Sequence, residues 1–315
     1  MASEAKTAFL EEMKKYGPLR KLDQSLSLFE IGDGMARIYI RYSKAHTKGR
    51  TVRVSFYGLR AEDLRKLEGH PSLICFLWDS QKEPLIVPFS DYEEVFQSTS
   101  PAGDGQYKVQ IYPQEDGTEL YIARAGRFNV EGHFGWGELE SLIDSAHIRT
   151  MPEFSHSQMQ TFLGAIGAAK GYDIWIPSND RVRLDRSLAN PFECRDVLPY
   201  GFESVKNVLE EVDVIWIQKG SSELRALFEV EHSTPIYSGL LRFNDIHLAA
   251  PRLRPTFSIV ANDARREVFV RQLNRPTFQA SELNKFCNFL EYINVFGWFN
   301  RIKTTPIGSK SHAEE

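Results

Sequence analysis

Hydrophobic residues in the second half of the chain recur first at helical spacing and then in short, compact runs. Met159, Phe162 and Ile166 mark one face of a helix that starts after Ser155, a typical residue at a helix start. In chain order, the pattern predicts a helix, three strands, a helix, a strand, a helix and a last strand, at 155–170, 172–176, 212–217, 224–231, 236–249, 256–261, 263–273 and 288–293. Residues 177–211 are predicted to form a long loop, and the sequence does not predict what this loop pairs with. This succession indicates an α/β domain.

The first 140 residues carry shorter apolar runs and indicate a separate α+β domain. They predict helices at 5–16, 61–68 and 90–96 and strands at 36–41, 51–57, 72–78, 84–88, 106–112 and 119–123. A basic turn at 43–50 is expected to join the first two strands. The boundary is expected within 145–156, which gives an N-terminal domain over 1–144 and a second domain over 145–303. The polar tail 304–315 is expected to be disordered.

Three carboxylates lie at one end of the predicted hairpin formed by 212–217 and 224–231. Asp213 opens its first strand, and Glu229 and Glu231 close the second. Residues i and i+2 of a strand share a face, so the two glutamates point the same way, at the end where Asp213 lies. Oxygen ligands of this kind are typical of Mg²⁺, which binds through few carboxylates and keeps water for a phosphate substrate. The pattern predicts a Mg²⁺ site, with Mn²⁺ as an alternative.

The same acids have a simpler interpretation as the solvent face of an amphipathic strand. Against it, Glu229 continues directly from the apolar run 226–228, and such runs usually form central strands that are covered on both faces. A carboxylate that ends a central strand needs a partner, because an unpaired buried charge is costly. The metal site is therefore the favoured interpretation, and the solvent face stays open as the alternative.

Asp213 followed by Glu229-x-Glu231 resembles the signature of the PD-(D/E)XK nuclease superfamily, to which most type II restriction endonucleases belong. In that signature a Lys usually stands where Glu231 stands here, and the Glu-x-Glu ending is a known variant among restriction enzymes. The order of elements over 155–303 is similar to the core of that fold. The resemblance implies a restriction-endonuclease-like mixed sheet flanked by helices, with the acids on its second and third strands.

This resemblance implies a metal-dependent endodeoxyribonuclease of the restriction or defence type, with an N-terminal domain for target recognition. Asp213 and Glu229 would bind the metal, and Glu231 would bind metal or accept a proton from the attacking water. An acid cannot supply the positive charge of the usual Lys. A catalytically inactive DNA-binding or protein-interaction module on the same fold is therefore the alternative. An RNA nuclease is a third interpretation, which no recognisable RNA-binding motif supports.

The net charge of −4 does not indicate a nucleic-acid-binding protein, but the charges are unevenly distributed. The segment 37–60 lacks acidic residues and interleaves aromatic residues with seven basic ones: Arg37, Arg41, Lys44, Lys48, Arg50, Arg53 and Arg60. Cations can bind phosphates and aromatic rings can stack, although the edge of two strands would show the same composition. DNA contacts are expected from four of these residues and from one on the helix after the acidic strand: Arg41, Lys44, Lys48, Arg50 and Arg242.

The remaining features fit an intracellular enzyme, for which we expect a cytoplasmic location. No apolar run reaches about 18 residues, the length of a membrane span, and the N-terminus lacks the apolar core of a signal peptide. Cys75, Cys194 and Cys287 are scattered, which favours free thiols over disulfides or a zinc site. We also expect a homodimer, because one carboxylate cluster cuts one strand of DNA, with a monomer that nicks DNA as the alternative. The apolar segment 289–299 would form its interface or belong to the core.

Overall fold

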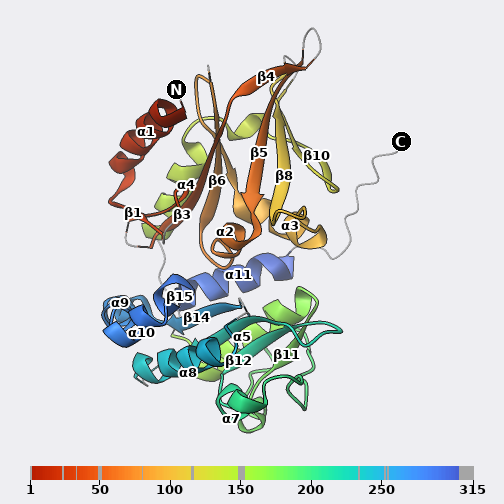
Figure 1. Ribbon diagram of the computed structural model, residues 1–315, viewed down its shortest axis with the longest axis vertical. Coiled ribbons are helices and arrows are strands. Elements are labelled where there is room, and N and C mark those ends of the chain that lie inside the picture. Colours follow the sequence, from red (N-terminus) through yellow and green to blue (C-terminus); the bar gives the residue numbers. More distant parts are fainter. Residues whose placement is uncertain are drawn as a thin grey trace. The chain divides into compact units, whose positions relative to one another are not determined.

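The chain divides into two compact units, Met1–Thr150 and Met151–Glu315 (Figure 1). Helix α4 (Gly137–His147) runs through residue 144, where the sequence predicts the end of the first domain. Helix α11 (Tyr292–Thr304) ends at the first residue of the predicted tail, and 305–315 lie outside the described residues. The structure is a computed structural model that describes residues 2–22, 25–32, 34–48, 52–79, 81–114, 117–147, 153–232, 235–251, 253 and 255–304.

The described residues of the first unit form two five-stranded sheets. The first has the strand order β1 (Leu19–Lys21), β2 (Leu28–Ile31), β3 (Ala36–Ser43), β6 (Ser72–Trp78) and β7 (Leu85–Pro88). The second has the order β10 (Gly126–Asn129), β9 (Glu119–Ile122), β8 (Gln106–Tyr112), β5 (Val52–Arg60) and β4 (Ala45–Lys48). β3 and β6 pair parallel. Side chains from both sheets, such as Tyr39 and Tyr57, are buried in one shared core.

Helices cover the other face of the first sheet. Phe9 of α1, Ile38 of β3 and Leu139 of α4 are buried together there. The helices of this unit are α1 (Ala2–Met13), α2 (Ala61–Arg65), α3 (Glu93–Ser98) and α4, with short 3₁₀ helices at Lys14–Tyr16, Phe89–Asp91 and Glu131–His133. The first unit is thus a layer of helices, a sheet and a second sheet, and the predicted α+β content of this part of the chain is confirmed.

The basic segment 43–50 is not a turn between two paired strands, so this prediction is wrong. The segment contains β4, which pairs antiparallel with β5, whereas β3 belongs to the other sheet. β4 lies at a sheet edge, where charged side chains are common, and it lacks the apolar alternation that reveals a strand. The sequence also fails to predict β1, β2 and β10, because three or four residues are too few to show a period.

The second unit is built on one mixed sheet. Its order is β11 (Tyr172–Trp175), β12 (Val214–Gln218), β13 (Leu224–Val230), β14 (Thr256–Ala261) and β15 (Cys287–Glu291). β11, β12 and β13 pair antiparallel, whereas β13, β14 and β15 pair parallel. The expected α/β class is confirmed. The last strand ends at Glu291 rather than at 293, because Tyr292 already begins α11.

Helices cover both faces of this sheet (Figure 1). On one face, α5 and α11 pack on Trp216 and Phe228. On the other, α8 and α9 pack on Ile215 and Leu227. This alternation places Glu229, the neighbour of Phe228, on the α8 face. The helices of the unit are α5 (His156–Ala169), α6 (Ser178–Arg181), α7 (Lys206–Glu210), α8 (Ile236–Ala249), α9 (Arg266–Leu273), α10 (Pro276–Ala280) and α11, with 3₁₀ helices at Glu203–Val205, Asp263–Arg265 and Leu283–Lys285.

The apolar segment 289–299 belongs to the core of the second unit. Tyr292 and Trp298 are buried with side chains of α5 and the sheet, and so is Phe299. Of the two expectations for this segment, a place in the core is confirmed. The homodimer stays a prediction, and these buried side chains are not available to form its interface.

Two expectations from composition can be compared with the fold. The thiols of Cys75, Cys194 and Cys287 are all free; the first and last are buried, and Cys194 is partly buried. The prediction of free thiols is therefore confirmed. Among the described residues, no helix combines the length and the apolar character needed to cross a membrane.

Candidate active site

The hairpin of β12 and β13 brings Asp213 next to Glu229 and Val230. The register of the two strands shifts by one residue near the turn, where Arg225 forms a bulge. Without this shift, Asp213 would lie opposite Phe228. Instead, Asp213 Oδ2 accepts a hydrogen bond of 2.7 Å from the backbone N–H of Val230. The bulge therefore determines which residues meet at the acidic end of the hairpin.

Glu229 and Glu231 lie on the same face of the sheet, beneath Gly239 of α8. Glu229 is 0% exposed and Glu231 is 2% exposed. A Cβ atom at position 239 would lie 2.8 Å from Glu231 Oε1 and 3.1 Å from Glu229 Cβ, so the helix approaches the acids as closely as only glycine allows. Arg265 donates a 2.7 Å hydrogen bond to the backbone carbonyl of Glu231 and fixes the strand end. The two glutamates are therefore buried side chains, and the solvent-face interpretation is wrong.

Arg242 of α8 neutralises the buried Glu229. Its Nε donates to Glu229 Oε1 at 2.8 Å and its Nη2 donates to Oε2 at 2.6 Å. Burial raises the pKa of Glu229 to about 8; the Arg242 hydrogen bonds oppose this rise, and the nearby charge of Asp213 adds to it. The hydrogen bonds to Glu229 in turn raise the pKa of Arg242. Arg242 Nη1 also lies 3.7 Å from Glu211, which is largely exposed.

His156 and Asp180 approach Asp213 from two other elements. His156 Nε2 lies 3.2 Å from Asp213 Oδ1, and the potential ligand atoms of all three residues lie within 4.8 Å of one another. Buried Gln160, one turn along α5 from His156, donates to Asp180 Oδ2 at 3.1 Å and to the Asp213 carbonyl at 3.4 Å. Burial lowers the pKa of His156, but the hydrogen bond and charge of Asp213 outweigh it and the net shift is upward.

The sequence gives weaker signals for these three additional residues. His156 and Gln160 are four residues apart, the spacing of one helix face, at the start of a helix whose Ser155 cap is visible in the sequence. That spacing is the signal that could have found them. For Asp180 and Arg181 the sequence suggests either an ion pair in a turn or a loop that faces the site; the ion pair is wrong, and Asp180 lies at the site. Arg181 pairs with Asp196 at 2.9 Å, which leaves the Asp180 carboxylate to Gln160 and to the site.

The donors around Asp213 fit a divalent cation. Carboxylate oxygens suit Mg²⁺ and Mn²⁺, and the imidazole nitrogen of His156 favours a transition metal such as Mn²⁺. In the described residues, the grouped ligand atoms are those of His156, Asp180 and Asp213; Glu229 and Glu231 are not in that group. Both oxygens of Glu229 are bound by Arg242. Asp213 thus belongs to both sets, the metal ligands predicted from the sequence and the group of ligand atoms found in the structure.

The basic residues of the first unit have different surroundings. Arg37 is buried, lies 3.5 Å from Glu30 and donates to the Lys66 carbonyl, so its role is structural. Arg41 is partly buried, with its guanidinium 5.7 Å from the centre of the Tyr39 ring. Lys44 is exposed between β3 and β4, and Lys48 ends β4. The side chain of Lys48 and all of Arg50 lie outside the described residues.

Comparison with known proteins identifies a family and a relative of this chain. Residues 140–307 match the family described as type II restriction enzyme NmeDI C-terminal domain. The chain is also similar to the type II restriction enzyme NmeDI of Neisseria meningitidis serogroup C, with 30% identity over 141 residues, which cover 42% of this chain and 39% of that enzyme. No solved structure matches the chain. The matched segment contains the mixed sheet and all the acids of the candidate site, and its length is more than half of the chain. The chain therefore belongs to the family of the type II restriction enzyme NmeDI C-terminal domain.

Proposed function

We propose that this chain is a metal-dependent endodeoxyribonuclease that hydrolyses phosphodiester bonds of DNA in restriction or defence. The observation that carries the proposal is the position of Asp213. Its carboxylate joins the acidic end of the hairpin to His156 and Asp180. This position lies inside the segment that matches the restriction enzyme family.

Asp213, Asp180 and His156 are the residues that would hold a divalent cation, Mg²⁺ or Mn²⁺. Such a cation supplies positive charge to the scissile phosphate and lowers the pKa of a bound water. Gln160 already fixes Asp180 and the backbone of Asp213, so these donors need little rearrangement. Preorganised donors of this kind are what hydrolysis of a phosphate ester requires, because the protein contributes mainly position and charge.

The charge of the acidic end also supports a bound cation. The charges of Asp213 and Glu231 both raise the pKa of Glu229, so these carboxylates disfavour one another's ionised forms. A divalent cation beside Asp213 would reduce this repulsion. Water screens the repulsion poorly, because both glutamates are almost fully buried. In this proposal Glu229 completes the negative site, and Glu231 accepts the proton of the attacking water.

Arg242 supplies the positive charge that position 231 lacks. In the resembling signature a Lys lies at the position of Glu231, two residues after the second acid. Here a guanidinium reaches the same acids from α8 and is held by two hydrogen bonds to Glu229. A bidentate guanidinium keeps its charge and its orientation. We therefore assign Arg242 to charge compensation within the site rather than to a DNA contact.

DNA recognition is assigned to the first unit, most of which lies outside the matched segment. The residues proposed for it are Arg41, Lys44, Lys48 and Arg50. The exposure of Lys44 is compatible with a phosphate contact. A homodimer in the cytoplasm remains part of the proposal.

A second candidate function is a DNA-binding or protein-interaction module without cleavage. It is favoured by the pairing of Glu229, because both of its oxygens are bound by Arg242 and neither is available to a metal in this arrangement. Such a module would bind its partner without a divalent cation and leave DNA intact.

Incubation of the full chain with varied DNA substrates and Mg²⁺ or Mn²⁺ tests the proposal. We expect cleavage that EDTA abolishes, and we expect Asp213→Asn and Glu231→Gln each to reduce the rate by about a hundredfold or more. The control is Glu223→Gln at the turn end of the hairpin, which should cleave like the wild type. DNA binding without strand breaks under all conditions would favour the second candidate.

A further inference from the structure

Val182 and Arg183 form an exposed tip on the segment between β11 and β12. Val182 is 85% exposed, and the side chain of Arg183 is 72% exposed. The tip follows Asp180, one of the candidate metal ligands, by two residues. Arg183 Nη1 lies 4.0 Å from Asp180 Oδ1, which is too long for a hydrogen bond. The guanidinium can therefore turn to another anion at little cost.

The chain before the tip is fixed by Arg181. Its Nε donates a 2.7 Å hydrogen bond to the carbonyl of Ile176, and its Nη1 donates to Asp196 at 2.9 Å. The same guanidinium lies 5.2 Å from the centre of the Trp175 ring. Arg181 thus connects the end of β11 to the returning chain near 196. The side chain next to Val182 is an internal anchor, whereas Val182 itself points outward.

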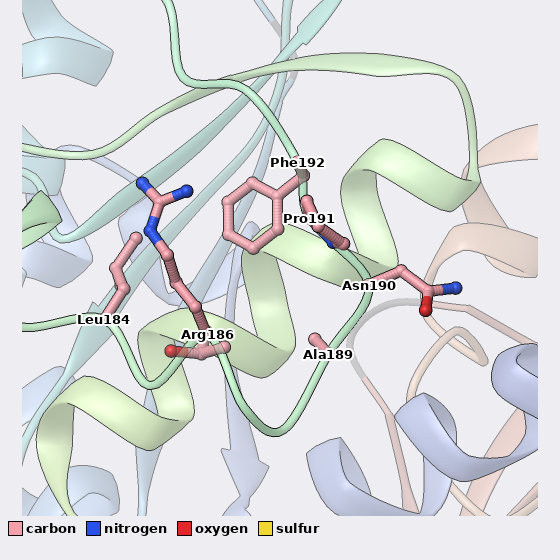
Figure 2. A pocket seen from close by; sticks show the side chains of 7 residues that line it. Leu184, Arg186, Ala189, Asn190, Pro191 and Phe192 are labelled. Carbon is pink, nitrogen blue, oxygen red and sulfur yellow. The ribbon is translucent and has the colours of Figure 1, made fainter.

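The chain after the tip is fixed on α5. Leu184 is buried, and the backbone N–H of Asp185 donates to Thr161 Oγ1 at 3.0 Å. Figure 2 shows Leu184 and Phe192 among the side chains that line a pocket. The ring of Phe192 would clash with any side chain at Gly164. The pocket between these residues has a volume of about 10 Å³, room for about one water, so it is packing rather than a ligand site.

We propose that the tip binds the DNA duplex beside the phosphate to be cut, with Arg183 on a backbone phosphate and Val182 against a sugar or base edge in the groove. This inference rests on the proposed function. Single exposed apolar residues are ordinary. Here the apolar side chain is anchored on both sides and stands next to the acids that receive the scissile phosphate.

The charges near the tip favour this partner. The carboxylates of Asp180 and Asp213 repel DNA phosphates, and a cation beside them lowers the electrostatic cost of approach. A guanidinium can bind one phosphate through two hydrogen bonds. Apolar side chains on a rigid support are also used by DNA-binding proteins as wedges in a groove. Arg183 would then increase the affinity for DNA, and Val182 would align the duplex.

Binding of the full chain to a fluorescent duplex in EDTA, which prevents cleavage, tests the tip. Arg183→Gln should weaken binding about tenfold and reduce the slope of log affinity against log salt concentration by about one. Val182→Ser should weaken binding less and leave the slope unchanged, because no charge is lost. The matched control is Arg225→Gln, which removes a positive charge that pairs with Glu223 at the turn end of the hairpin.

The possible results separate the two proposals. Weaker binding by Arg183→Gln with a reduced salt slope, next to wild-type binding by Arg225→Gln, supports the tip. If all three variants bind DNA as tightly as the wild type, the role of the tip is overturned and the proposed function is left intact. Protein that neither binds DNA in EDTA nor cuts it with Mg²⁺ or Mn²⁺ would overturn both. Thermal unfolding of Arg183→Gln and Val182→Ser should match that of the wild type, because both side chains are exposed.

Discussion

The two ends of the β12–β13 hairpin hold charged residues in opposite settings. At the turn end, Glu223 and Arg225 form an ion pair of 2.8 Å, and the Glu223 side chain is 53% exposed. At the other end, Glu229 is fully buried and pairs with Arg242 at 2.6 Å. The two arginines are similarly exposed, Arg225 at 28% and Arg242 at 26%, so the pairs differ in their carboxylates. A pair with an exposed carboxylate contributes about 0–1 kcal/mol to stability. A buried pair often contributes less than apolar side chains of the same volume would, because both ions lose their water.

This difference separates a stabilising surface pair from a group of charges whose best explanation is function. The charges of Asp213 and Glu231 raise the pKa of the buried Glu229, so the three carboxylates disfavour one another's ionised forms. Apolar residues would fill the same space at lower cost. A site that must receive a divalent cation, in contrast, requires carboxylates close together. The predictions below compare the two ends of the hairpin directly.

The largest effect is expected from Arg242→Met. At about pH 9 the variant should lose about 3–5 kcal/mol of unfolding free energy, because Glu229 must either remain an unpaired buried charge or take up a proton. Burial raises the pKa of Glu229 from 4.5 to about 8. The folded state therefore prefers the protonated acid. This contribution to stability is complete below about pH 4.5 and is lost as the pH rises toward 8.

Without Arg242 the pKa of Glu229 rises further, so the cost of the variant should shrink at about pH 5, where the acid is protonated in both proteins. Urea unfolding at the two pH values measures this change. The matched control is Arg225→Met at the turn end, with an expected loss below about 1 kcal/mol. Replacement of both Arg242 and Glu229 by Met should restore much of the stability. Equal losses of unfolding free energy in Arg242→Met and Arg225→Met at about pH 9 would contradict the difference between the two ends of the hairpin.

A smaller effect is expected from the metal. Mg²⁺ or Mn²⁺ at about one hundred times its Kd should stabilise the wild type by about 2.7 kcal/mol, and should not stabilise Asp213→Asn. Asparagine keeps an oxygen that can accept the Val230 N–H, so the metal-free stability should change little. Thermal unfolding with metal or EDTA measures both quantities, with Glu223→Gln as the control. His156→Ala should reduce the preference for Mn²⁺. Equal stabilisation of Asp213→Asn would place the metal elsewhere.

The pattern of apolar residues predicts the five strands of the second unit and the helices α5 and α8, whose apolar side chains are buried in its core, but it does not predict α11. α8 and β14 have the predicted bounds, β12 differs from them by two residues at its start and one at its end, and β13 by one residue at its end. The two glutamates share a face for the same local reason, the period of a strand. Edge strands such as β4 have no buried face to reveal them. The sequence therefore predicts the first unit less completely.

The remaining parts of the site depend on contacts that no local pattern encodes. His156 and Asp180 lie 57 and 33 residues before Asp213 and reach it only after α5 and α6 pack beside the sheet. The bulge at Arg225 leaves no mark in the apolar pattern, yet it sets the register at Asp213. Arg242 is visible in the sequence as a cation after the acidic strand, but its partner is a buried carboxylate.

The smallest difference is expected between two helix glycines, Gly239 above the acids and Gly297 in α11. Alanine improves helix propensity by about 1 kcal/mol at either position. At 297 the nearest atom to a new Cβ is Arg301 Nη1 at 3.6 Å, so Gly297→Ala should stabilise the protein.

At 239 the new atom would meet Glu231 Oε1 at 2.8 Å and Glu229 Cβ at 3.1 Å. The Glu231 carboxylate can swing aside, but Glu229 Cβ is fixed to the sheet. Overpacking of this kind costs about 1–3 kcal/mol, so Gly239→Ala should be neutral or destabilising. Urea unfolding of the two variants measures the difference. A gain in stability at 239 equal to that at 297 would mean that α8 does not press on the acids, and that the crowding at the acidic end is not a constraint on the site.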